Sequence, residues 1–128
     1  MAPGNGLVLL IEDDDDLREV EISILEGAGF RVASARDGCE ALELVAREMP
    51  AVIFLDMRMP GMDGWAFARE FRARHGQQAP LVVTTAAPNA QRRAEEIAAD
   101  DVLGKPFDAQ RLLEVAQHHV TDGSTRNR

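Results

Sequence analysis

Five consecutive apolar residues, at positions 51–55, end directly at the carboxylate of Asp56. A short apolar run of this kind, bounded by turn residues, is typical of a strand buried on both faces of a parallel sheet. Pro60, Gly61 and Gly64 then interrupt the chain, so Asp56 is expected where the strand ends and a loop begins. In open α/β sheets, ligands bind at this end of the strands. Asp56 is therefore a candidate site residue, although an Asp at such a place can also simply cap a turn.

Apolar segments that suit strands alternate along the chain with segments of helical periodicity. The predicted strands occupy residues 7–11, 30–34, 51–55, 81–85 and 101–104. The predicted helices occupy residues 15–28, 37–49, 64–75, 90–98 and 108–120, with Asp37, Asp63 and Asp108 as predicted N-terminal caps. This alternation predicts an α/β fold with one five-stranded parallel sheet. Right-handed crossovers would place helices on both faces, giving a doubly wound sheet with a short fourth helix.

The first predicted helix has an apolar stripe that should face the core. The residues that recur at helical spacing are Leu17, Val20, Ile24, Leu25 and Ala28. Ile22 lies off this stripe, so it either packs at the edge of the stripe or belongs to an exposed docking patch. The histidines near helix ends, His75, His118 and His119, are expected to be solvated.

Length and charge restrict the possible functions. The 128 residues suit one domain, predicted at 7–120 between a flexible leader at 1–6 and a flexible tail at 121–128. A net charge of -8 argues against contact with nucleic acid and against adsorption to an anionic membrane. No apolar run is long enough to span a bilayer. The single Cys39, expected to fill a small apolar space, excludes an internal disulfide and fits a reducing cytoplasm.

Polar residues follow four of the five predicted strands. Glu12 and Asp13 follow the first strand, Asp56 the third, Thr85 ends the fourth, and Lys105 follows the fifth. Because parallel strands end at one edge of the sheet, these side chains should converge there. Clustered carboxylates need a cation to stay ionised together, and Mg²⁺ prefers such oxygen ligands. Each residue alone can have an ordinary structural role. A metal, a lysine and a hydroxyl around one carboxylate, however, are the groups needed to phosphorylate that carboxylate, giving an aspartyl phosphate.

These segments resemble the response-regulator receiver domains of bacterial two-component signalling. The matching stretches are 8–14, 55–64, 83–86 and 100–107, within a resemblance that covers about residues 6 to 120. The resemblance implies a flavodoxin-like strand order 2-1-3-4-5 and a Mg²⁺ cofactor. With no sequence left for an output domain, we expect a stand-alone receiver in the cytoplasm.

The resemblance also assigns roles to individual residues. Asp56 would accept a phosphoryl group from the phosphohistidine of a sensor histidine kinase or a histidine phosphotransfer protein. Thr85 and Lys105 would contact that group, and the Lys105–Pro106 peptide bond would be cis. The residues that would hold Mg²⁺ are Glu12, Asp13, Asp56 and the main-chain carbonyl of Arg58. Output would be contact with an unknown downstream protein, in a phosphorelay for example, without nucleic acid or membrane.

Two departures from the family pattern concern the output. Val102 stands where relatives usually carry an aromatic residue, and the segment between Thr85 and Lys105 is short. We therefore expect any switch to involve the loop after Thr85 and the fourth helix. One alternative function is a phosphate-independent, receiver-like binding module. The other is an aspartyl-phosphate phosphatase, which is disfavoured because Arg58 stands where such enzymes carry a second acid. The chain is thus expected to catalyse only its own phosphorylation and dephosphorylation.

Overall fold

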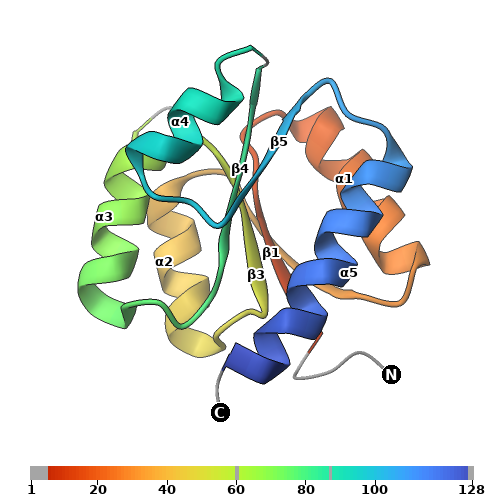
Figure 1. The fold of residues 1–128 in the computed structure, drawn as a ribbon, viewed down its shortest axis with the longest axis horizontal. Coiled ribbons are helices and arrows are strands. Elements are labelled where there is room, and N and C mark those ends of the chain that lie inside the picture. The colour runs from red at the N-terminus through yellow and green to blue at the C-terminus, as the bar shows by residue number, and fades with distance from the viewer. Residues whose placement is uncertain (1–5, 60, 87, 127–128) are drawn as a thin grey trace.

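The computed structural model describes residues 6–59, 61–86 and 88–126, and shows a five-stranded parallel sheet between two layers of helices (Figure 1). The strands are β1 Leu7–Ile11, β2 Arg31–Ala35, β3 Val52–Asp56, β4 Leu81–Ala86 and β5 Asp101–Lys105. The helices are α1 Asp15–Gly27, α2 Gly38–Arg47, α3 Gly64–His75, α4 Ala90–Glu96 and α5 Ala109–Arg126. The strand order β2-β1-β3-β4-β5 confirms the predicted fold, and α4 has only 7 residues, as predicted for the fourth helix.

Helix starts follow the expected capping chemistry. The carboxylates of Asp37 and Asp63 accept hydrogen bonds from main-chain N–H groups three residues later, each at 2.9 Å, and Asp108 does so at 2.8 Å. The end of α5 differs from the prediction, because the helix continues to Arg126 instead of ending near 120. No proline interrupts residues 121–126, so the backbone ladder simply continues. Of the predicted flexible ends, residues 1–5 and 127–128 lie outside the described residues.

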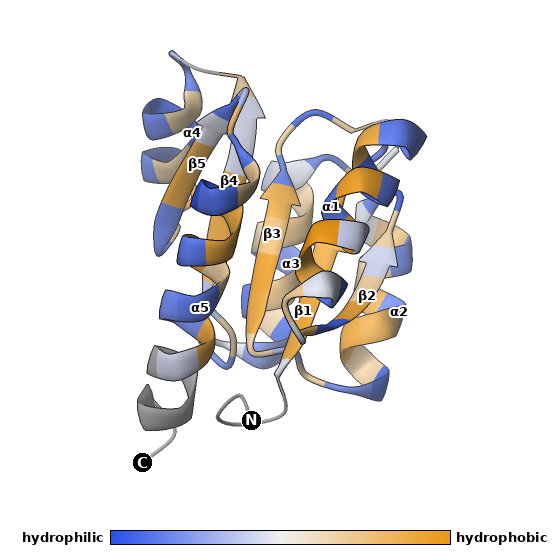
Figure 2. Cartoon of the chain, turned by 90° about the vertical axis from the view of Figure 1, so that its right-hand side faces the viewer, coloured by the Kyte–Doolittle hydropathy of each residue, from blue (hydrophilic) through white to orange (hydrophobic). Residues whose placement is uncertain are grey.

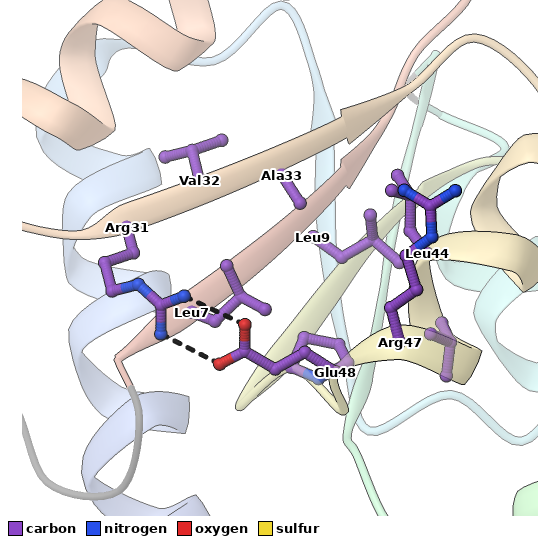
Figure 3. Close-up of a pocket in the computed structure, with 10 residues that line it drawn as sticks. Leu7, Leu9, Arg31, Val32, Ala33, Leu44, Arg47 and Glu48 are labelled. Carbon is purple, nitrogen blue, oxygen red and sulfur yellow. Dashed lines mark hydrogen bonds and ion pairs between the residues drawn. The ribbon is translucent and has the colours of Figure 1, made fainter.

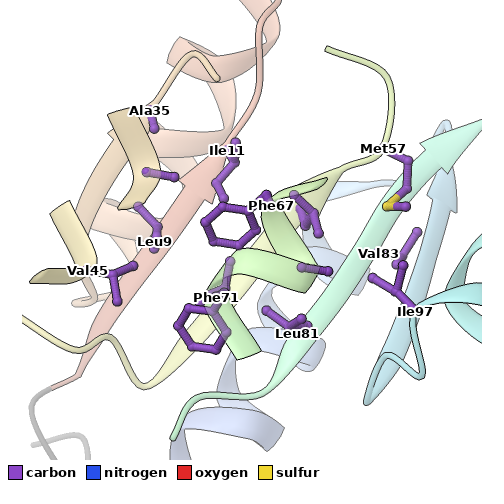
Figure 4. Packing of buried hydrophobic residues seen from close by; sticks show 14 of the residues in the cluster. Leu9, Ile11, Ala35, Val45, Met57, Phe67, Phe71, Leu81, Val83 and Ile97 are labelled. Atoms are coloured by element: carbon purple, nitrogen blue, oxygen red, sulfur yellow. The ribbon is translucent and has the colours of Figure 1, made fainter. Parts of the chain in front are cut away.

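The sheet separates two hydrophobic cores. Successive strand residues point to opposite faces, so Leu9 and Ile11 contact the core beneath α2, α3 and α4, whereas Val8 and Leu10 contact the core beneath α1 and α5. Figure 4 shows the first core, where the fully buried Phe67 and Phe71 of α3 lie against the strands. The hydropathy colouring shows β3 apolar along its length (Figure 2). Burial of each large apolar side chain contributes roughly 1.5–3 kcal/mol to folding.

The prediction of which α1 residues face the core was partly wrong. Val20 is 55% exposed, whereas Glu21 is only 2% exposed. The line of α1 that faces the sheet passes through Leu17, Glu21 and Leu25, which are spaced four residues apart. Leu17 and Ile24 are half-buried and Ala28 is exposed. Ile22 packs against the second core, so it lies at the edge of the buried stripe.

Two further predictions were wrong. His119 is buried, and its Nε2 lies 3.0 Å from Asp101 Oδ2, because α5 packs this part of its length against the sheet. His118, beside it, is exposed as predicted. Cys39 is exposed and fills no apolar space. Among the described residues, no helix is long and apolar enough to cross a membrane.

A cavity of about 270 Å³ lies between β2 and α2 (Figure 3). Its apolar walls include Leu9, Val32 and Leu44. Arg31 and Glu48 form a bidentate ion pair beside it, with both N–O distances at 2.8 Å. Since Arg31 and Leu7 belong to the amino ends of their strands, this cavity lies toward the opposite end of the sheet from the strand ends that carry the candidate site residues.

Candidate functional site

The topology brings the predicted acids together. Glu12 and Asp13 directly follow β1, and Asp56 is the last residue of the neighbouring β3. One carboxylate oxygen from each of these three residues lies within 4.8 Å of the others. Glu12 and Asp56 are buried, at 2% and 5% exposure, whereas Asp13 is exposed to solvent. The acidic cluster of Glu12, Asp13 and Asp56 therefore has a buried base and an open side.

Lys105 supplies the positive charge beside this acidic cluster. It ends β5, and its Nζ lies 2.6 Å from Glu12 Oε1 and 3.5 Å from Asp56 Oδ2. Burial tends to lower the pKa of Lys105, but the hydrogen bond to Glu12 and the charge of Asp56 raise it above its usual value. The next peptide bond, Lys105–Pro106, is cis, as expected. A charged ammonium is thus held between two buried carboxylates.

Burial raises the pKa of Asp56 to about 7, and the nearby carboxylate of Glu12 adds to this effect. Two contacts act in the opposite direction: the main-chain N–H of Arg58, which donates to Asp56 Oδ1 at 3.1 Å, and the charge of Lys105. The ionised form of Asp56 is therefore costly without more positive charge. A hard divalent cation would supply that charge, and the three clustered carboxylates fit its preference for oxygen ligands.

A cavity of about 450 Å³ opens beside the acidic cluster. Asp13, Arg58 and Asp63 contribute its polar walls, and Met57, Met59 and Trp65 its apolar ones. The Arg58 residue is exposed, and its main-chain N–H is already bonded to Asp56. A bound group could therefore reach Asp13 from solvent, next to the buried Glu12 and Asp56.

The two threonines of β4 lie on opposite faces of the sheet. Asp56 pairs in register with Thr84, so the alternation of strand residues places these two side chains on the same face. The predicted site residue Thr85 is buried one position later, at 6% exposure. Among the hydrogen bonds of the described residues, none joins Thr85 to the acidic cluster. Thr84 is a second buried hydroxyl at this edge, which the sequence analysis did not single out.

The loop after Asp56 packs tightly against the start of α3. A Cβ atom on Gly64 would lie 2.5 Å from Met57 Sδ and 2.7 Å from Met57 Cα. The N–H of Gly64 donates to the carbonyl of Met57 at 3.2 Å. Only glycine permits this close approach, so Gly64 lets the start of α3 lie directly against Met57, the residue after Asp56.

Glu21 is a buried acid that the sequence analysis missed. Burial raises its pKa to about 7, and the carboxylates of Glu12 and Asp56 raise it too, while Lys105 lowers it. These influences place Glu21 within electrostatic reach of the acidic cluster. Its burial could have been predicted from its position four residues from both Leu17 and Leu25, which places Glu21 on the buried line of α1.

Comparison with known proteins is consistent with this geometry. Residues 8–117 match the family profile of the response regulator receiver domain. The response regulator MprA of Mycobacterium leprae is 39% identical over 108 residues, which cover 83% of this chain and 47% of MprA. The DNA-binding transcriptional regulator NtrC of Escherichia coli K12 is 34% identical over 118 residues, covering 91% of this chain and 25% of NtrC. The chain thus spans half or less of the length of these relatives.

Solved structures agree in fold. A CheY-like response regulator receiver domain protein from Methanospirillum hungatei superposes with a TM-score of 0.83 at 31% identity, covering 98% of this chain and all of the other. A putative response regulator from Chloroflexus aurantiacus superposes with a TM-score of 0.81 at 29% identity, covering 89% of this chain and 96% of the other. The similarity extends over nearly the whole chain in both cases.

Proposed function

This chain belongs to the response regulator receiver domain family, and we propose that it accepts a phosphoryl group on Asp56 from the phosphohistidine of a partner protein. The partner would be a sensor histidine kinase or a histidine phosphotransfer protein. The observation that carries the proposal is the contact of Lys105 Nζ with both Glu12 and Asp56, at 2.6 and 3.5 Å. An ammonium in this position can bind a phosphoryl group as soon as one forms on Asp56.

The chemistry is an in-line displacement at phosphorus. An oxygen of Asp56 forms the new P–O bond while the P–N bond to the donor imidazole breaks, and the imidazole leaves with the bonding electrons. Glu12, Asp13, Asp56 and the main-chain carbonyl of Arg58 would hold Mg²⁺, which when bound neutralises charge on the phosphoryl oxygens. The N–H of Arg58 holds Asp56 Oδ1, so Oδ2, the oxygen nearer Lys105, is free to attack.

The phosphoryl group would then change the contacts of Lys105 and Thr85. Lys105 would exchange its bond to Glu12 for one to a phosphoryl oxygen, and the side chain of Thr85, which starts on the other face of the sheet from Asp56, would turn at the strand end to donate a hydrogen bond to another. Movement of Thr85 shifts the chain that leads from β4 into α4. Val102 packs against the first core and has a stiff branched side chain, so we expect it to change little.

The test is intact-mass spectrometry after incubation with acetyl phosphate. Wild-type chain should gain one phosphoryl mass in the presence of Mg²⁺ and none when the metal is chelated. Asp56→Asn should gain none, because the amide is not a nucleophile. Asp16→Asn, a matched change at an exposed acid of α1, should behave as wild type.

An equal phosphorylated fraction in Asp56→Asn and wild type would refute the assignment of the nucleophile. Absence of any product in the wild type would favour a phosphate-independent binding module. Repeated turnover of small phosphomonoesters would instead favour a phosphatase. Incubation with acetyl phosphate tests the first two outcomes, and a separate assay with a phosphomonoester tests the third.

A further inference from the structure

The surface between α3 and α4 combines arginines with apolar side chains. A groove of about 450 Å³ lies there, and we call it the α3–α4 groove. It is lined by Trp65, Ala68, Arg69 and Arg72 of α3, and by Glu96, Ile97 and Ala98 at the end of α4. Figure 1 shows α4 lying close to one end of α3. Two arginines thus flank a floor of apolar side chains.

The charge of these two helices opposes that of the whole chain. The helices α3 and α4 carry five arginines and three glutamates, a net charge of +2, whereas the chain carries -8. Two of the three glutamates are already paired with arginines: Glu70 contacts Arg74 at 3.1 Å, and Glu96 contacts Arg93 at 3.2 Å. The charged residues that line the α3–α4 groove are Arg69, Arg72 and Glu96, which give it a net charge of +1 on an acidic protein.

The arginines that line the groove keep their positive charge available. Within the described part of the chain, the hydrogen bonds of Arg72 go to neutral groups, the main-chain carbonyls of Ile97 and Ala98. Arg69 is exposed, and no ion pair of the described residues includes it. Glu96 is the one acid lining the groove, and it already accepts hydrogen bonds from the indole N–H of Trp65 at 2.9 Å and from Arg93. The positive field of Arg69 and Arg72 is therefore not cancelled within the groove.

Apolar groups and hydrogen-bond donors lie side by side in the α3–α4 groove. Ala68 and Ile97 are buried at its base, and the half-buried Trp65 carries Arg93 over its ring at 5.3 Å. The carboxylate of Glu96 already occupies the indole N–H of Trp65 and the guanidinium of Arg93, whereas no ion pair of the described residues includes Arg69 or Arg72. A ligand that matches both features has apolar side chains next to carboxylates.

We propose that the α3–α4 groove is a docking site for an acidic, amphipathic segment of a partner protein. The carboxylates of that segment pair with Arg69 and Arg72, and its apolar side chains pack on Trp65 and Ile97. A nucleic acid fits less well, because the -8 charge of the chain repels a polyanion. The groove adjoins the cavity beside the acidic cluster, because Trp65 lines both, but no groove residue belongs to that cluster. This binding therefore does not require a phosphoryl group on Asp56, and failure of either proposal leaves the other standing.

The chain provides its own reporter for this site. Trp65 is the single tryptophan of the sequence and lines both the α3–α4 groove and the cavity beside the acidic cluster, so its fluorescence reports binding at either place, and charge reversal at Arg69 distinguishes the two. The probe is a blocked nine-residue peptide of alternating glutamate and leucine, and its control has lysine in place of glutamate. We expect a saturable change in emission with the glutamate peptide and none with the lysine peptide. Asp56→Asn should bind the glutamate peptide as the wild type does.

Charge reversal separates a local site from a general charge effect. Arg69→Glu should weaken binding of the glutamate peptide at least tenfold, and it should still be phosphorylated at the wild-type rate. Arg111→Glu makes the same change of charge on the exposed part of α5 and should bind as wild type. The proposal is overturned if the glutamate peptide causes no saturable change, if the lysine peptide binds equally well, or if both variants lose affinity to the same extent. Displacement of the peptide by an equal concentration of inorganic phosphate would also overturn it, because the groove would then be a simple anion site.

Discussion

The acidic cluster at the sheet edge and the α3–α4 groove are both charged, but different interactions position their side chains. At the sheet edge, backbone topology brings Lys105 to Glu12 across 93 positions of sequence, because each follows or ends a parallel strand. In the groove, contacts between helix side chains, such as that of Trp65 with Glu96, fix the arrangement. The first arrangement is set by the sheet itself, and the second depends on a few exchangeable contacts.

This difference also separates chemistry from recognition. Buried carboxylates with a single ammonium are rigid and partly desolvated, which suits them to stabilise charge during a reaction. In the α3–α4 groove Arg69 is exposed and Arg72 half-buried, so both keep contact with solvent, which suits binding that can be adjusted without loss of the fold. Substitutions at the sheet edge should therefore change reactivity strongly, whereas substitutions in the groove should change binding or local stability.

The largest effect is expected for Lys105→Ala. Loss of the ammonium removes the cation that meets the phosphoryl group, so the initial rate of phosphorylation by acetyl phosphate should fall about 100-fold. Arg111→Ala, with the same loss of one charge on α5, should leave the rate unchanged, as should Arg69→Ala in the groove. Rates measured by intact mass at saturating Mg²⁺ decide this. Equal rates for Lys105→Ala and Arg69→Ala would remove the contrast between the two regions.

A second effect concerns the buried Glu21. Its pKa in the folded chain is about 7, against an ordinary value of 4.5, so between these pH values the folded state binds a proton that the unfolded state has released. Stability contributed by this group therefore falls as pH rises through that window and is lowest above pH 7. Glu21→Leu should raise the free energy of unfolding by about 2 kcal/mol at alkaline pH, and by less at acid pH.

Urea unfolding of wild type and Glu21→Leu on both sides of this pH window measures the difference. Glu21→Gln, which keeps the shape and removes the charge, serves as the second variant and should change stability in the same direction. Lower stability of both variants at alkaline pH would show that ionised Glu21 stabilises the fold. That result would mean that the attraction between ionised Glu21 and Lys105 exceeds the free-energy cost of burying the Glu21 carboxylate.

The smallest effect is expected at the end of α4, beside the α3–α4 groove. Ala98 has a φ of 50°, in the left-handed region that costs a non-glycine residue about 1 kcal/mol. Ala98→Gly removes this cost but adds freedom to the unfolded chain, so a net gain of about 0.5 kcal/mol is expected. Ala99→Gly is the matched control and should lower stability. A loss of stability in Ala98→Gly as large as that in Ala99→Gly would contradict the argument.

The sequence predicted which polar residues lie at the sheet edge better than it predicted which helix residues are buried. Asp56 and Lys105 could be placed because apolar strands end visibly in polar residues, and parallel strands end at one edge. The phase of α1 was harder to predict, since Val20 and Glu21 are neighbours and only packing decides which one faces the sheet. The burial of His119 depends on its contact with Asp101, 18 positions away. Long-range side-chain contacts of this kind leave no local pattern in the sequence.

The residue that carries the phosphoryl group is central to the proposed chemistry. Borohydride reduces an acyl phosphate to an alcohol, so an aspartyl phosphate becomes homoserine, which peptide sequencing by mass spectrometry can locate. After reaction with acetyl phosphate and Mg²⁺, we predict homoserine at position 56 of the wild-type chain and at no other acid. Homoserine at Asp13, or the longer 2-amino-5-hydroxypentanoic acid at Glu12, in place of homoserine at position 56 would contradict Asp56 as the phosphoacceptor, as would phosphorylated chain with no reducible acid.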